Sequence, residues 1–243
     1  MAWSSDLREP LEPGSPPAAG ECHVWVVPIV HGDRWSGLLD AAERVRAAEH
    51  RVGAPRLTFV ASRSVQRLVA AHYLKRDPRA VTIRRGCEHC GDPGHGRPTL
   101  TDGGSLDYSV SHSGGWLVMA VVGAGRVGVD LEEVRDLGEV DDLAALTFAA
   151  GEYARYRALA GADRSVAFYR GWTRKEAVAK LAGRGLSLEL SHIAVDGPAI
   201  TMPDWWPGGP VHVRDLPAPS GYAAALASTV ELDGVRLCRP HWA

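Results

Sequence analysis

The sequence has few cysteines, no long apolar run and no excess of charge of either sign. Four cysteines in 243 residues, without a secretion signal, argue against a disulfide framework. No apolar run approaches the roughly 18 residues of a membrane span. Lys and Arg number 27 and Asp and Glu 29, so no positive excess favours nucleic acid. These absences predict a cytoplasmic protein with neither membrane nor nucleic-acid partners.

The first twenty residues, "MAWSSDLREPLEPGSPPAAG", have no basic start followed by an apolar core, as a signal peptide would. Their Pro, Gly and Ser content predicts a disordered leader over residues 1–20. With 45% hydrophobic residues, the remainder can form one large domain or two small ones. A boundary near residues 120–126 predicts an N-terminal half over 21–122 and a C-terminal half over 123–243.

The hydrophobic patterns predict an α+β fold. Apolar residues at helical spacing predict helices near residues 35–51 and 56–76, over 141–160 with a break near Gly151, and over 163–182. Short runs rich in β-branched residues predict strands. These runs are "HVWVVPIV", "AVTIRR", "LDYSVSH", "WLVMAVVG", "RVGVDLEEV", "HIAV", "VHVRDL" and "YAAALAS".

The strand "GRVGVDLEEV" carries Asp130 and Glu132 two positions apart. Side chains at this spacing share one face of a strand, so the two carboxylates lie side by side and repel each other. A divalent cation such as Mg²⁺, which prefers oxygen ligands, removes that repulsion. The alternative is an edge strand whose two carboxylates face water.

Two further segments each allow both a functional and an ordinary structural interpretation when taken alone. In "WTRKEAVAKLAGRGL", Trp172, Glu176 and Lys180 lie along one helical face, as they also would on an ordinary amphipathic helix. In "VSHSGGW", Ser111 and His112 precede a Gly-Gly turn. Such a turn can hold a phosphate, or its side chains can simply satisfy backbone groups.

Together and in this order, "SHSGGW", "VGVDLEEV" and "WTRKEAVAK" resemble the phosphopantetheinyl transferases of the Sfp type. The family signature is G-[IV]-D-x-E followed by W-x-x-K-E-[AS]-x-x-K, and both parts are present. The resemblance covers roughly residues 63–195. It implies a pseudo-dimer of two similar α+β halves, with the active site and coenzyme A in the cleft between them.

The resemblance also implies roles for individual residues. Asp130, Glu132 and Glu176 would be the Mg²⁺ ligands, with Mn²⁺ as an alternative ion, and Lys180 would contact the pyrophosphate. Glu176 would accept the proton of the attacking serine, directly or through a metal-bound water, with Glu152 of "FAAGEY" as the second candidate; Lys175 has no assigned role. The coenzyme A contacts would be Arg63, Ser64, Arg97 of "HGRP", Ser111 and His112.

The implied enzyme transfers the 4′-phosphopantetheine arm of coenzyme A to a serine of an apo acyl or peptidyl carrier protein, releasing 3′,5′-ADP. A monomer that serves polyketide, peptide or fatty-acid synthesis is expected. Two other classes compete with it. A coenzyme A-binding module without catalysis would share the phosphate contacts. A zinc-dependent protein would use Cys87, Cys90 and His95, which have knuckle-like spacing but lack the second CxxC that a four-ligand site needs.

Overall fold

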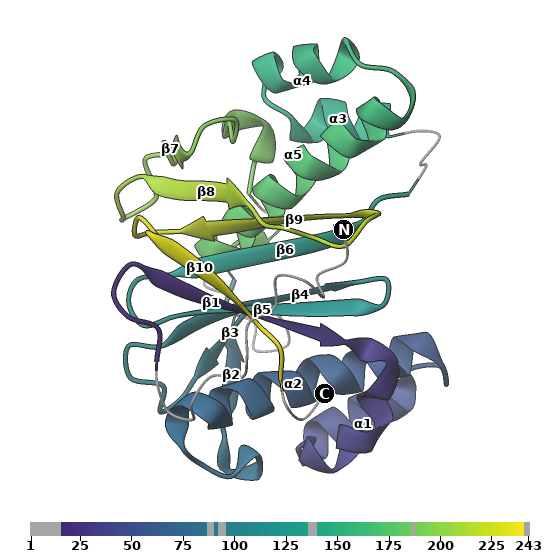
Figure 1. Cartoon of the computed structure of the whole chain (residues 1–243), viewed down its shortest axis with the longest axis vertical. Helices are drawn as coiled ribbons and strands as arrows, with labels where there is room; N and C mark the ends of the chain where they lie inside the picture. Colours follow the sequence, from purple (N-terminus) through teal and green to yellow (C-terminus); the bar gives the residue numbers. More distant parts are fainter. Residues whose placement is uncertain (1–15, 87–89, 92–95, 136–139, 186–187, 241–243) are drawn as a thin grey trace.

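The computed structural model describes residues 16–86, 90–91, 96–135, 140–185 and 188–240. It has two four-stranded sheets, a two-stranded sheet, and helices that pack on the outer faces of the larger sheets (Figure 1). The α+β class predicted from the sequence is confirmed. No helix in the described ranges combines the length and the apolar character needed to cross a membrane.

The first large sheet has the strand order β10-β1-β5-β4. Its strands are β1 (Glu21–Pro28), β4 (Asp107–Ser113), β5 (Trp116–Val122) and β10 (Gly234–Cys238). On the chain before β4, β2 (Ile83–Gly86) pairs with β3 (Arg97–Leu100) as a separate ribbon. The long helix α2 (Ala54–Leu74) covers one face of the first sheet, and α1 (Ala41–Glu49) precedes it.

The second large sheet has the order β6-β9-β8-β7. Its strands are β6 (Val127–Glu133), β7 (Ala199–Ile200), β8 (Val211–Asp215) and β9 (Tyr222–Ser228). The helix α5 (Gly161–Ala182) packs on it. The shorter helices α3 (Asp141–Thr147) and α4 (Ala150–Arg157) lie beyond the amino-terminal part of α5 (Figure 1).

Strand alternation builds a core between the two large sheets. In β1, Val24 and Val26 face the second sheet, whereas Trp25 and Val27 pack under α2. In β6, Val129 and Leu131 join the same central core and are fully buried. The molecule is therefore layered as helix, sheet, sheet, helix, and each long helix covers the outer face of one sheet.

The edges of the two large sheets meet where β4 lies beside β6. No backbone ladder joins these edges, and side chains of β4 contact the backbone of β6 instead. Asp107 Oδ2 accepts the amide of Val127, and Ser109 Oγ accepts the amide of Val129. The offset is twenty residues in both pairs, so the two strands run parallel.

The structure differs from the predicted elements at several places. "HIAV" is not a strand: His192 ends a 3₁₀ turn over residues 190–192, and residues 193–195 are irregular. The sequence patterns also did not indicate β3, β7 or β10, and β10 returns to the first sheet beside β1. Of the predicted leader, residues 1–15 lie outside the described residues, while Pro17 is buried. The division into halves at residues 122 and 123 stays a prediction.

Candidate active site

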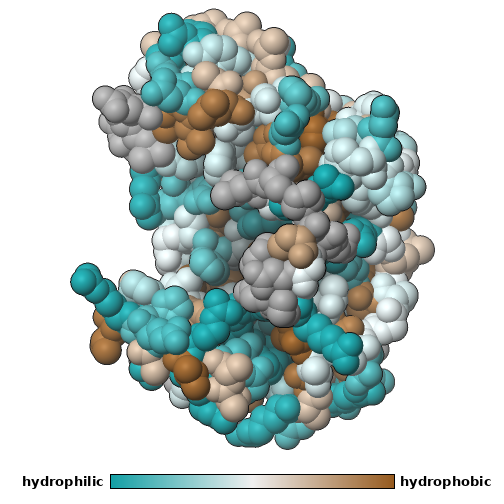
Figure 2. Space-filling view, turned by 180° about the vertical axis from the view of Figure 1, so that it is seen from behind, coloured by the Kyte–Doolittle hydropathy of each residue, from teal (hydrophilic) through white to brown (hydrophobic). Residues whose placement is uncertain are grey.

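A pocket of about 530 Å³ lies where β4, β6, α2 and α5 converge. Seen from behind, the molecule is hollowed at one side between its upper and lower parts, and hydrophilic side chains border much of that hollow (Figure 2). The lining includes predicted site residues from both large sheets and both long helices. They are Arg63, Ser111, His112, Asp130, Glu132, Glu176 and Lys180.

The strand β6 directs its carboxylates into this pocket by simple alternation. Because Val129 and Leu131 face the core, Asp130 and Glu132 face the other way. On α5, the residues Trp172, Glu176 and Lys180 follow helical spacing and line the same pocket. The strand β6 and the helix α5 thus bring Asp130, Glu132 and Glu176 to one pocket. Both elements lie in the predicted C-terminal half, whereas the resemblance implied a strand from one half and a helix from the other.

Gly128 allows the strand and the helix to approach each other closely. A Cβ atom at this position would overlap the carbonyl oxygen of Ala177 and lie 2.7 Å from the amide nitrogen of Leu181. Both groups belong to the backbone of α5, which cannot move aside as a flexible side chain could. The glycine of the G-[IV]-D-x-E motif is therefore needed for packing β6 against α5.

Asp130 is the most buried of the three carboxylates, at 2% exposure. Its Oδ1 accepts hydrogen bonds from Lys180 Nζ at 2.6 Å and from Ser111 Oγ at 2.8 Å. Within the described part of the chain, its buried Oδ2 has no hydrogen-bond partner, and neither does the buried Oε1 of Glu176. Two buried carboxylate oxygens are thus left with unused acceptor capacity.

Burial raises the pKa of Glu176, and the negative charge of Asp130 raises it further. Burial also raises the pKa of Glu132, although the hydrogen bond from Ser113 acts in the opposite direction. Lys180 pairs with Asp130, and its positive charge opposes the rise in the pKa of Glu132 and of Glu176. The pocket therefore has the chemistry of a site for a divalent cation, with hard oxygen ligands and unpartnered buried oxygens.

The carboxylates do not by themselves form a complete set of metal ligands. Among the described residues, no three His, Cys, Asp or Glu side chains are grouped closely enough to hold a metal ion by themselves. Such a site would resemble the usual Mg²⁺ arrangement, in which one or two carboxylates act together with substrate phosphates.

The pocket is also lined by basic groups. Among them are Arg63 of α2 and His112 of β4, two of the predicted coenzyme A contacts. Removal from bulk water lowers the pKa of His112, and the nearby charge of Lys180 lowers it further. Arg85 of β2 also lines the pocket and donates to Gln66 Oε1 at 2.9 Å. Arg85 was not predicted, since "IRR" in a short strand was the only signal for it.

Two residues predicted to bind coenzyme A make internal contacts instead. Ser64 is fully buried and donates to the carbonyl of Trp35 at 3.0 Å. Arg97 makes a bidentate ion pair with Asp107 and also donates to the carbonyl of Val127 at 2.8 Å. Neither lines the pocket. Arg97 instead joins β3, β4 and the start of β6.

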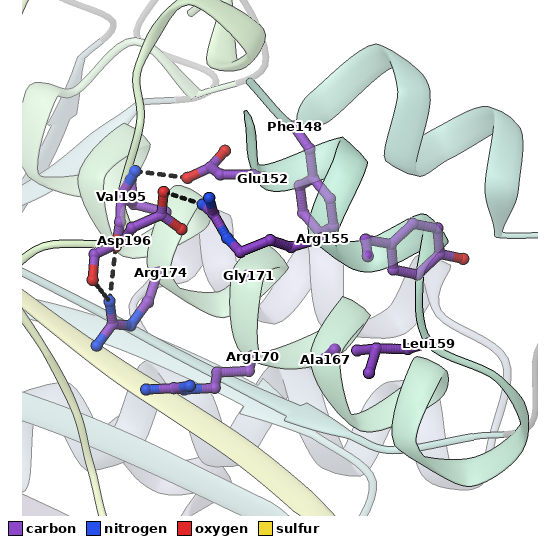
Figure 3. Close-up of a pocket in the computed structure, with 11 residues that line it drawn as sticks. Phe148, Glu152, Arg155, Leu159, Ala167, Arg170, Gly171, Arg174, Val195 and Asp196 are labelled. Atoms are coloured by element: carbon purple, nitrogen blue, oxygen red, sulfur yellow. Dashed lines mark hydrogen bonds and ion pairs between the residues drawn. The ribbon is translucent and has the colours of Figure 1, made fainter. Parts of the chain in front are cut away.

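Glu152 also lies away from the carboxylate pocket. Its Oε1 accepts the amide of Val195 at 2.6 Å, and its Oε2 accepts the amide of Ala149 and pairs with Lys175 at 2.6 Å. Lys175 is fully buried and also donates to the carbonyls of Leu190 and Ile193. Figure 3 shows Glu152 beside a different pocket, against Val195 and near Arg155.

The structure leaves the zinc hypothesis untested. Cys87 and His95 lie outside the described residues, whereas Cys90 is exposed. The other two cysteines, Cys22 and Cys238, are free and buried, and burial raises the pKa of each thiol to about 12.

Comparison with known proteins identifies relatives of one kind. The model of the 4′-phosphopantetheinyl transferase superfamily matches residues 126–210. The chain is 32% identical to a 4′-phosphopantetheinyl transferase of Bacillus subtilis over 167 residues, which covers 67% of this chain and 69% of that protein. It is 28% identical to HetI of Nostoc over 76% of this chain and 79% of that protein. It is also 28% identical to Sfp of Bacillus subtilis over 55% and 60%, respectively. This chain belongs to the 4′-phosphopantetheinyl transferases of the Sfp type.

Proposed function

We propose that this protein transfers the 4′-phosphopantetheine arm of coenzyme A to a serine hydroxyl of an acyl or peptidyl carrier protein. The observation that carries the proposal is one pocket lined by carboxylates and by basic groups. The strand β6 and the helix α5 supply Asp130, Glu132, Glu176 and Lys180, and α2 and β4 supply Arg63 and His112. Basic side chains from both long helices, Arg63 and Lys180, suit a ligand with two separate phosphate groups, as coenzyme A has.

Coenzyme A would bind with its nucleotide end toward α2 and β4 and its pyrophosphate toward β6 and α5. Arg63 and His112 would contact the 3′-phosphate, and Arg85, which lines the same pocket, is a further donor. Lys180 lies next to Asp130, where it can also donate to a pyrophosphate oxygen.

Mg²⁺ would be held by Asp130, Glu132 and Glu176 together with the pyrophosphate. When bound, it would supply charge neutralisation for the phosphoryl oxygens. The two unpartnered oxygens of Asp130 and Glu176 support this assignment. Mn²⁺ has similar ligand preferences and would fit the same oxygen set.

In the reaction, the serine oxygen of the carrier protein forms a bond to the β-phosphorus of coenzyme A. The bond from that phosphorus to the bridging oxygen breaks, and 3′,5′-ADP leaves. Glu176, which lines the pocket, accepts the serine proton, either directly or through a water molecule. Lys180 stabilises the negative charge that develops on the phosphate oxygens.

Glu152 is assigned a structural role in this proposal. All of its observed contacts are internal, and its carboxylate is already paired with Lys175. A monomeric state, a cytoplasmic location and a role in polyketide, peptide or fatty-acid synthesis remain part of the proposal.

The proposal is tested by mass spectrometry of an apo carrier protein after incubation with this protein, coenzyme A and Mg²⁺. The expected result is a mass gain of one phosphopantetheine arm on the carrier, which disappears when EDTA replaces Mg²⁺. If several acyl and peptidyl carriers gain no mass while coenzyme A still binds in a titration, the protein is a binding relative without transfer activity. A gain that persists in EDTA would refute the metal assignment alone.

A further inference from the structure

Three serines of β4 alternate along the strand and point toward β6. Ser109 Oγ accepts the amide of Val129 at 3.1 Å, and Ser113 Oγ accepts the amide of Glu133 at 3.1 Å. Ser111, between them, donates to the carboxylate of Asp130. This row of hydroxyls forms the seam where the two large sheets meet.

The hydroxyl of Ser113 has a defined orientation. Because its oxygen accepts the amide of Glu133, its own hydrogen remains free to point at Glu132 Oε2, which lies 2.8 Å away. The turn that follows Ser113 is also fixed. Tyr222 Oη accepts the amide of Gly115 at 3.3 Å and donates to Glu133 Oε1 at 3.4 Å.

The two strand carboxylates differ in how many groups hold them. Asp130 receives hydrogen bonds from both Lys180 and Ser111. In the described ranges, Ser113 is the one hydrogen-bond donor to the carboxylate of Glu132. Removing Ser111 would leave Asp130 tied to Lys180, whereas removing Ser113 would leave Glu132 without a fixed orientation.

We infer that Ser113 is a positioning residue for the divalent cation, acting through Glu132. Its hydroxyl donates to Oε2 of Glu132 and orients the carboxylate so that Oε1 remains free for the ion. This inference rests on the proposed function, since it requires that Glu132 binds the metal. Hydrogen-bond partners of metal-binding carboxylates commonly contribute about 10- to 100-fold to metal affinity.

The test is Mn²⁺ binding, measured from the loss of the free Mn²⁺ signal in electron paramagnetic resonance. Saturating coenzyme A is present and carrier protein is absent, so no turnover occurs. Ser113→Ala is expected to weaken Mn²⁺ binding about 10-fold or more. Ser113→Thr keeps the hydroxyl and is expected to bind like the unaltered protein.

Ser109→Ala is the matched control. It also removes an acceptor of a β6 amide, but it removes no donor to a carboxylate. It should therefore lower stability as Ser113→Ala does and leave Mn²⁺ affinity unchanged. If Ser113→Ala does not fold, the pair Ser113→Val and Ser113→Thr, which differ only in the hydroxyl, gives the same comparison.

Three outcomes overturn the inference in different ways. If Asp130→Ala binds Mn²⁺ as the unaltered protein does, the metal site itself is wrong, and the inference fails with it. If Asp130→Ala loses binding while Ser113→Ala retains it, the metal site stands and Ser113 has no part in it. If Ser109→Ala and Ser113→Ala weaken Mn²⁺ binding equally, the effect arises from the contact between β4 and β6 and not from Glu132.

Discussion

Lys180 shows how the chemistry of the pocket depends on single residues. It lies one helical turn after Glu176, and its Nζ contacts Asp130 at 2.6 Å. Its side chain is 29% exposed, so it can contact a bound ligand as well as the carboxylate. In the proposed reaction it lies where negative charge develops.

Lys180→Met keeps the length of the side chain and removes its charge. We expect kcat to fall on the order of 10²- to 10³-fold, because one preorganised charge contact is lost in the transition state. Steady-state transfer assays, together with a coenzyme A titration, separate this loss of rate from a loss of binding. A variant with unchanged kcat would exclude Lys180 from the reaction.

Arg97 shows the limit of prediction from sequence at this scale. Its motif, "HGRP", indicates a nucleotide contact by resemblance, but the structure gives it Asp107 and Val127 as partners. These partners lie 10 and 30 residues further along the chain, and no local pattern links them to Arg97. Asp130 and Glu132 were predictable because strand alternation is local.

At the scale of elements, the contact of β6 with α5 sets the distance between the carboxylates of the strand and of the helix. Gly128 is the point of closest approach, opposite the backbone of Ala177. The sequence motif contains this glycine, but only the packing of the helix explains why a side chain is excluded there.

Gly128→Ala is expected to push α5 away from β6. Overpacking of this kind costs about 1–3 kcal/mol in the free energy of unfolding, and transfer activity should fall even where the variant is fully folded. Urea unfolding and activity assays test both effects. Gly209→Ala, where a Cβ meets nothing within 4 Å, is the control. Full activity in folded Gly128→Ala would contradict this explanation of the motif.

The buried pair of Lys175 and Glu152 joins α5 to α4 and to the segment around residues 190–195. Lys175→Met removes one partner and leaves a buried charge, so we expect a loss of about 3–5 kcal/mol in the free energy of unfolding. Arg170→Met breaks an exposed pair with Asp215 and should cost less than about 1 kcal/mol. A stable Lys175→Met with greatly reduced kcat would instead favour a catalytic role.

At the scale of the whole molecule, His23 makes stability depend on pH. It is buried in β1, and Tyr73 Oη lies 2.9 Å from its Nδ1. Trp25 Nε1 donates to that same Oη, so the tyrosine hydrogen is directed to a neutral imidazole. Burial lowers the pKa of His23, although Glu21 opposes the shift.

Because the folded-state pKa of His23 is lower than the unfolded one, the unfolded chain binds more protons between these two values. Stability should therefore fall as the pH drops below about 6.5, by up to about 1.4 kcal/mol for each unit of pKa difference. His23→Asn keeps an acceptor near Tyr73 and should reduce this dependence. Urea unfolding at about pH 7.5 and about pH 5.5 measures it. Equal pH dependence in both proteins would contradict the assignment.

The sequence predicted the long helices and most of the strands, but not the return of the last strand, β10, to the first sheet. Long helices such as α2 and α5 carry periodic patterns, so they could be placed within a few residues. The strand β10 pairs with β1 across more than 200 residues, and such long-range pairing has no local signal. The segment "HIAV" has strand-like composition, but Ile193 and Val195 are buried against α5 without sheet pairing.

The most direct test of the account is the rate of phosphopantetheine transfer by Asp130→Asn at saturating coenzyme A and Mg²⁺. This change keeps the size of a side chain that is 2% exposed and removes the charge at the centre of the pocket. Asp102→Asn, at an exposed surface pair with Arg76, is the control. We predict a fall of at least about 10²-fold for Asp130→Asn and none for the control. Transfer by Asp130→Asn at the rate of the unaltered protein would show that this pocket is not the centre of the reaction.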